Sequence, residues 1–343
     1  MIPYLIPLFL YLILCFIAKK DKVLYIASFF LFALLPAFRY NVGGTDYFIY
    51  EQAYNNQDLK FEPFYNLTAF LFYESGMTFN IFLCLITLAC FTFLLYSIKK
   101  NTSFFYLAFL IYLGKLYIFY DFVILRQFLA MPFIWIALTY LRDDNKKRFF
   151  LFWSIGFLFH YSAIFILPIY FIRNKIISTK FIIISLLIGL SSGFFFIKII
   201  QFLCNNIPYI AYRLNAYLEK SSSANLFNFI EISLIIGIIL IYRAKFNKLY
   251  KHSNFYLNLL WFSALLLFIF SSLEDIKRAR DYFIVAYFMI LPLIPSLFKK
   301  KHVKIFIYCL LSFYFTMLYI RSILLFDETT SVGKLIPYNI FIQ

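Results

Sequence analysis

The side chains most able to do chemistry in this sequence are ionisable groups set inside long apolar segments. Arg126 lies near the start of DFVILRQFLAMPFIWIAL, and His160 lies within FLFHYSAIFILP. An ionisable side chain at the centre of a membrane helix costs about 2.5–3.5 kcal/mol on insertion scales, so each one needs a compensating role. A guanidinium can grip an anion with its rigid set of donors, and a buried neutral imidazole can accept a proton. We therefore interpret Arg126 as an anion-binding group and His160 as a candidate general base.

Further arginines lie at the ends of apolar segments, where a lipid headgroup is within reach. Two acidic residues occur near the first of them, Asp46 in RYNVGGTDYFIY and Glu62 in FEPFYNL. Together with Asp121, these acids compete with His160 for the role of base. Cations gathered on one membrane face could bind a lipid-linked pyrophosphate, which carries dense negative charge. The further arginines are Arg39, Arg278, Arg280 and Arg321.

Each of these residues also has a purely structural interpretation. Arg126 could pair with Asp121 or extend to the outer interface, and Arg39 could anchor the chain at the interface or pair with Asp46. The segment EDIKRARDYF could be a solvated charged loop, and His160 could be a hydrogen-bonded packing residue. The sequence leaves both interpretations open.

The composition excludes a soluble enzyme. Of the 343 residues, 64% are hydrophobic and 14% are charged, with a mean hydropathy of +0.83. Soluble domains are about half apolar and about a quarter charged. The sequence contains no Gly-rich phosphate loop, no hydrolase motif and no His/Cys cluster with metal-ligand spacing, so we expect neither a metal nor a cofactor.

Apolar segments long enough to cross a bilayer recur along the whole chain. A membrane helix needs about 20 apolar residues. We predict a single all-α polytopic membrane domain, residues 1–343, with about ten transmembrane helices. The predicted spans are 2–18, 23–38, 78–98, 103–119, 120–141, 181–203, 226–242, 255–272, 282–298 and 303–325.

The segment 149–172 differs from these spans because basic residues flank it on both sides. Arg142 and Arg148 precede it, and Arg173 and Lys175 follow it. If both flanks face the cytoplasm, the segment must enter and leave the membrane as a re-entrant helical hairpin. Such backbone is tolerated only against protein or a wet cavity. The alternative is one tilted span.

The distribution of charge sets the predicted orientation. With the N-terminus outside, the predicted cytoplasmic loops hold 20 of the 32 basic residues and 3 of the 16 acidic ones, as the positive-inside rule requires. The net charge of +16 is therefore a topology signal, and we expect no nucleic-acid partner. The periplasmic connections are then 39–77, which contains two interfacial helix-like stretches rich in Tyr and Phe, the loop 204–225 and the tail 326–343.

Four ordered motifs resemble the EpsG-like group of Wzy-type polysaccharide polymerases, which are integral membrane proteins of bacteria. Each motif is short, but together they run in the family's order from the first long loop to the tail. They are RYNVGGTDYFIYEQAY at 39–54; FEPFYNL at 61–67, followed by Gly76; LRQFLA at 125–130 with FHYSAIFILPIY at 159–170; and RARDYF at 278–283 with IPYN at 336–339.

The resemblance implies an O-antigen, capsule or exopolysaccharide polymerase of GT-C-like architecture in the bacterial inner membrane. Its donor and acceptor would be undecaprenyl-pyrophosphate-linked oligosaccharides, joined on the periplasmic side without a metal. Its partners would be membrane lipids and a chain-length regulator protein. The resemblance also implies that His160 acts as base and that arginines hold the pyrophosphate; we add Asp46 as a second catalytic candidate and Tyr47 as a substrate-binding one. The implied arginines are Arg39, Arg126, Arg278 and Arg280, to which we add Arg321.

Two other functions stay open at this point. A flippase of lipid-linked oligosaccharide would share the spans and the basic residues, although the inverted repeats and broken helices typical of transporters are not evident. A membrane acyltransferase would need a His beside an Asp or a second His. That is the weaker alternative, because His252 and His302 fall in predicted cytoplasmic loops and leave His160 alone in an apolar segment.

Overall fold

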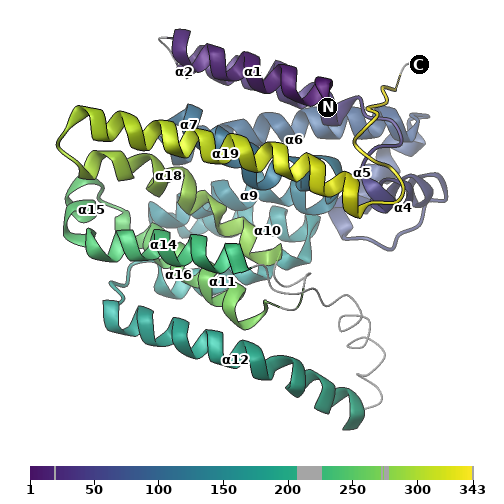
Figure 1. Cartoon of the computed structure of the whole chain (residues 1–343). Coiled ribbons are helices and arrows are strands. Elements are labelled where there is room, and N and C mark those ends of the chain that lie inside the picture. The colour runs from purple at the N-terminus through teal and green to yellow at the C-terminus, as the bar shows by residue number, and fades with distance from the viewer. Residues whose placement is uncertain (19–20, 207–225, 272, 274–277, 342–343) are drawn as a thin grey trace. The chain divides into compact units, whose positions relative to one another are not determined.

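The computed structural model describes residues 1–18, 21–206, 226–271, 273 and 278–341 (Figure 1). Within these residues the regular structure is helical, and the one extended pairing is an isolated antiparallel bridge between Arg39 and Ile340. The prediction of an all-α fold is confirmed for the residues that the structure describes. Most of the predicted loop 204–225 lies outside the described residues.

The predicted apolar segments coincide with helices. The predicted span 78–98 is α6 (Phe79–Asn101), and the predicted span 226–242 is α14 (Leu226–Ile241). Two predicted spans are interrupted by π-helical turns, at Phe29–Ala33 and Leu113–Tyr117. The other helices of these segments are α1 (Ile2–Ile17), α2 (Asp21–Ser28), α3 (Leu34–Ala37), α7 (Phe105–Tyr112), α8 (Ile118–Phe122), α9 (Leu125–Arg142), α12 (Thr179–Asn206), α15 (Arg243–Leu249), α16 (Ser253–Ile269), α18 (Val285–Leu293) and α19 (Lys301–Thr329).

The helices have the length and composition of a membrane protein. Among the described residues, four helical stretches are long and apolar enough to cross a bilayer. A fifth is obtained if α14 and α15, which are bent by 79° at their junction, form one broken span. The number of ten crossings remains a prediction. The four stretches are Phe79–Asn101, Phe105–Phe122, Arg280–Leu297 and Lys301–Thr329.

The chain groups into two compact units. Unit 1 comprises residues 1–163 and 294–343, and unit 2 comprises residues 164–293. In unit 1, α9 packs against α6 and α10, and nearly all of its side chains are buried, including Trp135. In unit 2, α16 packs against α12 and α14. Every residue of the site described below lies in unit 1.

The helix breaks at His160, inside the segment predicted to be a hairpin. Helix α10 (Lys146–Phe159) ends there, and a 3-10 turn (Tyr161–Ile166) and α11 (Leu167–Ile172) follow. The indole Nε1 of Trp153 donates to the carbonyl of Ala163 at 2.9 Å. In a continuous helix, residues ten positions apart are separated by about 15 Å along the axis. The predicted break in this segment is therefore present, whereas re-entry from one membrane face remains a prediction.

The long connection 39–77 contains two short helices, as predicted. They are α4 (Gly44–Asn55) and α5 (Pro63–Glu74). The bend before α4 requires glycine, because Gly43 has a φ of +131° and a Cβ there would lie 2.2 Å from the Phe122 carbonyl oxygen. Helix α5 starts with Pro63, whose missing N–H is tolerated at the first position of a helix. This start fixes the place of Glu62, the residue just before α5.

Candidate active site

Glu62, Arg126 and His160 meet in unit 1 although they are far apart in the sequence. Nη1 of Arg126 donates to Oε2 of Glu62 at 2.5 Å, and Nδ1 of His160 lies 2.7 Å from Oε1 of the same carboxylate. The backbone N–H of Tyr161 approaches Oε1 at 3.4 Å. One carboxylate thus bridges a guanidinium and an imidazole, each on its own oxygen. We call these three residues the carboxylate cluster.

Each member of the carboxylate cluster lies where a helix begins or ends. Glu62 precedes α5, Arg126 is in the first turn of α9, and His160 follows α10 with extended backbone (φ −157°, ψ 118°). Helix α10 packs against both α9 and α5. The packing of these three helices therefore determines where the cluster forms.

Aromatic rings enclose the Arg126 guanidinium. Its central carbon lies 4.5 Å from the centroid of the Phe61 ring and 5.9 Å from that of the Tyr50 ring. Its Nε donates to the Tyr50 hydroxyl at 3.4 Å. Cation–π contacts of this kind contribute about 0.5–2 kcal/mol, more when they are desolvated. These contacts hold the guanidinium in place and use only part of its five N–H donors.

Glu62 is an anion by virtue of its two partners. Its side chain is 4% exposed, whereas those of Arg126 and His160 are 26% and 21% exposed. Burial alone would raise the pKa of this carboxyl group, but the hydrogen bond to His160 and the positive charge of Arg126 outweigh burial and lower the pKa to about 2. Glu62 is therefore a weak base, while Arg126 and His160 keep surface that a substrate can reach.

The carboxylate selects one form of the imidazole. An ionised carboxylate only accepts hydrogen bonds, so the neutral His160 ring carries its proton on Nδ1, facing Glu62, and its lone pair on Nε2. In catalytic triads a carboxylate orients a histidine base in this way and stabilises the imidazolium once the proton is taken up. The cluster can therefore remove a proton from a group placed at Nε2.

The interpretation in which Asp121 neutralises Arg126 is wrong. Asp121 is fully buried in α8 and accepts a hydrogen bond from Tyr112, whereas the acid bound to Arg126 is Glu62. The physical reason is the turn between α8 and α9, which places Asp121 and Arg126 on separate helices.

Arg39 is an enclosed cation. It is buried, its Nη1 donates to the Pro36 carbonyl at 2.5 Å, and its guanidinium carbon lies 5.8 Å from the Phe122 ring centroid. Its Nε has no hydrogen-bond partner among the described residues. Arg39 therefore lies against the end of α8 rather than in the carboxylate cluster.

The remaining candidates of unit 1 lie around α4 and α19. Tyr47 is buried and donates to Oδ1 of Asn80 at 2.7 Å, which fastens α4 to α6. Asp46 is half-buried in the first turn of α4. Arg321 is exposed on α19. The tyrosine that the structure brings to Arg126 is Tyr50, one turn further along α4 than Tyr47.

Arg278 and Arg280 lie in unit 2. Arg278 is half-buried, and Nε of Arg280 lies 3.5 Å from Oδ1 of Asp281. Their neighbours Glu274, Asp275 and Lys277 lie outside the described residues. A role for both arginines in pyrophosphate binding remains a prediction.

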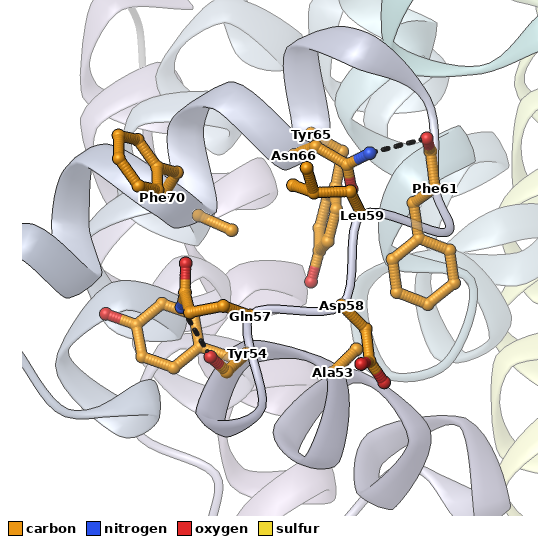
Figure 2. A pocket seen from close by; sticks show the side chains of 10 residues that line it. Ala53, Tyr54, Gln57, Asp58, Leu59, Phe61, Tyr65, Asn66 and Phe70 are labelled. Atoms are coloured by element: carbon orange, nitrogen blue, oxygen red, sulfur yellow. Dashed lines mark hydrogen bonds between the residues drawn. The ribbon is translucent and has the colours of Figure 1, made fainter.

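A small pocket lined by both polar and apolar side chains lies beside the carboxylate cluster, between α4 and α5 (Figure 2). The hydroxyl of Tyr65 points into it, and this side chain is 2% exposed without a hydrogen-bond partner for the hydroxyl in the described part of the chain. Phe61 lines the pocket and also contacts the Arg126 guanidinium. The lining further includes Tyr54, Gln57, Asp58, Asn66 and Phe70.

The sequence singles out Arg126 and His160 of the carboxylate cluster but gives no sign of its aromatic neighbours. Glu62 was only one of several competing bases, and Tyr50 and Phe61 were not singled out. Glu62 is 64 positions from Arg126 and 98 from His160, so no local spacing links them. The sequence does contain one signal for this cluster. Glu62, Arg126 and His160 each lie in a family motif, namely FEPFYNL, LRQFLA and FHYSAIFILPIY. Within the described residues, no group of three or more His, Cys, Asp or Glu side chains could hold a metal ion.

Comparison with known proteins agrees with the motifs. The model of the EpsG family matches residues 22–340, which is nearly the whole chain and includes the carboxylate cluster. No curated protein and no solved structure matches the chain.

Proposed function

Because the chain belongs to the EpsG family, we propose that it is a polysaccharide polymerase. It would join lipid-pyrophosphate-linked oligosaccharide repeat units by glycosyl transfer. The observation that carries this proposal is the carboxylate cluster, in which a histidine oriented by a buried anion lies beside an accessible arginine. Glycosyl transfer from a pyrophosphate needs a base for the attacking hydroxyl and positive charge for the leaving group, and this cluster offers both.

The reaction follows from the orientation of His160. A hydroxyl of the acceptor sugar gives its proton to Nε2 of His160, and its oxygen forms a bond to the anomeric carbon of the donor chain. The bond from that carbon to the pyrophosphate breaks, and the electron pair leaves with the lipid pyrophosphate. Glu62 stabilises the imidazolium until the proton passes to solvent or to the departing phosphate.

The arginines supply the charge that the leaving group needs. Arg126 has N–H donors beyond those that it gives to Glu62 and Tyr50, and part of its side chain is exposed. Fixed cations stabilise developing negative charge without having to reorganise during the reaction. We infer that Arg321 and the enclosed Arg39, both of unit 1, add to this charge.

The proposed setting is the periplasmic side of the bacterial inner membrane. It includes about ten crossings and a GT-C-like arrangement, undecaprenyl-pyrophosphate-linked units as both donor and acceptor, and a chain-length regulator as partner. Support for this setting comes from the family match and from the asymmetric distribution of basic residues.

Deletion of the gene, followed by gel analysis of the surface glycan, tests the function. A polymerase mutant keeps single repeat units and loses the long polymer, and the wild-type gene restores the ladder. Loss of all surface repeat units, with lipid-linked units retained at the inner leaflet, would instead identify a flippase. An unchanged ladder in the deletion strain would refute both assignments.

A further inference from the structure

The Tyr65 hydroxyl is a buried polar group that the proposed reaction does not use. Its ring packs against Tyr50, Phe61 and Phe82, with centroids 5.6, 5.3 and 6.0 Å away. Its oxygen has no hydrogen-bond partner among the residues that the structure describes. Buried polar groups are nearly always paired, so an unpaired one indicates a partner that is not part of the chain. Burial raises the pKa of Tyr65 well above its usual range, so the hydroxyl stays protonated and can donate.

The polar groups around Tyr65 are held in place and present oxygen atoms. The amide nitrogen of Asn66 donates to the Phe61 carbonyl at 2.7 Å, and that of Gln57 donates to the Tyr54 carbonyl at 2.6 Å (Figure 2). Both amides therefore have their side-chain oxygens left to accept hydrogen bonds. No lysine or arginine is among the described residues that line the pocket. This favours a neutral ligand rich in hydroxyl groups over a phosphate.

The size of the pocket limits what enters it. Its enclosed space holds about one water molecule or one hydroxyl group. Leu59 and Phe70 are exposed at its edge, where they offer apolar surface. A sugar suits this shape, because one hydroxyl can enter while the C–H face of the ring covers the apolar edge.

The pocket and the carboxylate cluster share structural elements. Phe61 lines the pocket, contacts the Arg126 guanidinium and directly precedes Glu62. The Tyr65 ring packs against Tyr50, whose hydroxyl accepts from Arg126. A ligand anchored at Tyr65 is therefore held next to the groups that would act on it.

We propose that this pocket binds a hydroxyl group of the acceptor sugar, with the Tyr65 hydroxyl as its hydrogen-bond donor. The inference rests on the proposed polymerase function and assigns one part of its acceptor site. A single bound water molecule is the competing occupant.

The substitution Tyr65→Phe tests the proposal, because it removes only the unpaired hydroxyl. The full chain is purified into liposomes, and initial polymerisation rates are measured against the concentration of lipid-linked repeat units isolated from a strain that lacks the polymerase. We expect the half-saturating concentration to rise roughly three- to tenfold, which corresponds to the binding free energy of one neutral hydrogen bond. The maximal rate should stay within about twofold and the melting temperature should not fall, because no hydrogen bond within the protein is lost.

The matched control is Tyr117→Phe, a buried tyrosine of unit 1 whose hydroxyl donates to the Phe32 carbonyl at 2.7 Å. This control should lower the melting temperature and leave the half-saturating concentration unchanged. An unchanged half-saturating concentration in Tyr65→Phe would mean a bound water only and would overturn the inference, as would a change confined to the maximal rate. Neither result affects the proposed function, which is tested separately by whether the wild-type protein forms polymer in this assay.

Discussion

Replacing Glu62 with glutamine would disrupt the carboxylate cluster with almost no change in shape. A glutamine amide has one accepting oxygen and one donating NH2 group. The Arg126 guanidinium can only donate, so the amide oxygen must face Arg126 and the NH2 group must face Nδ1 of His160. Nδ1 then accepts a hydrogen bond, and the ring proton moves to Nε2. The lone pair that would receive the hydroxyl proton is lost.

The size of the effect follows from this change of tautomer. A hydrogen bond to a charged group contributes about 1.5–3 kcal/mol, and each 1.36 kcal/mol is about a factor of ten in rate. Loss of the charge alone therefore predicts a rate about 10- to 150-fold lower. In the serine-protease triad, the corresponding change from Asp to Asn lowers kcat by about 10⁴. We expect Glu62→Gln to lower the polymerisation rate by about 10²- to 10⁴-fold.

The same substitution has a pH signature in stability. The pKa of Glu62 is lowered to about 2 in the folded protein, against 4.5 for an unperturbed glutamic acid. Its charge therefore stabilises the fold fully above about pH 4.5, and this contribution is lost as the pH falls towards 2. The melting temperature of Glu62→Gln should lie below that of the wild type at neutral pH, and the difference should shrink between about pH 4.5 and 2.

The assay compares initial rates of the purified variants on lipid-linked repeat units, with melting temperatures measured in parallel. The matched control is Glu74→Gln, an exposed acid at the other end of α5, which should leave the rate unchanged. Glu62→Asp keeps the charge but is one methylene shorter, so it should retain more activity than Glu62→Gln. A folded Glu62→Gln protein that polymerises within about threefold of the wild type would refute the tautomer argument.

Three further predictions concern unit 1, two at the carboxylate cluster and one at the bend before α4. Arg126→Lys should lower the polymerisation rate at least tenfold. The lysine ammonium lacks the planar set of donors with which the guanidinium binds the Glu62 carboxylate and the Tyr50 hydroxyl together. A normal glycan ladder would contradict this prediction. His160→Ala should leave the protein in the membrane but abolish long polymer on glycan gels, and near-normal polymer would reduce His160 to a packing residue. Gly43→Ala should destabilise the fold by at least about 1–3 kcal/mol in thermal unfolding. The new Cβ would lie 2.2 Å from the Phe122 carbonyl oxygen, and the backbone there has a φ of +131°. An unchanged melting temperature would mean that the bend relaxes freely.

The helices were predictable because lipid imposes a simple length rule on apolar segments. The rule is weaker where apolar character is continuous. The boundary between the predicted spans 103–119 and 120–141 lies, in the structure, at the turn between Phe122 and Leu125. Hydropathy does not mark that turn, because the residues on both sides of it are apolar. The π-helical turns at Phe29–Ala33 and Leu113–Tyr117 were also not predicted. They depend on packing against neighbouring helices, which a local pattern does not contain.

The candidate site was predictable only where an ionisable side chain lies inside an apolar segment. Arg126 and His160 stand out because ionisable groups are costly inside apolar segments. Glu62 lies in a polar connection, where a carboxylate is unremarkable, and its importance arises from the packing of α5 against α10. The same holds for the Tyr65 pocket, which is formed by two short helices whose individual sequences look like ordinary interfacial segments.

Because Glu62 bonds two partners through its two oxygens, Arg126 and His160 are not independent. Truncation of Arg126 leaves a buried anion without one of its two partners, which is costly and loosens the carboxylate that orients His160. Loss of polymer in an Arg126→Ala protein therefore has two causes that a gel does not separate, namely a lost pyrophosphate contact and a His160 that Glu62 no longer holds in place. Arg126→Lys keeps a positive charge beside Glu62, so the defect of this variant measures the planar donor geometry of the guanidinium rather than its charge. The cluster also explains how an arginine persists inside an apolar segment, since its charge is neutralised from a neighbouring helix rather than from its own.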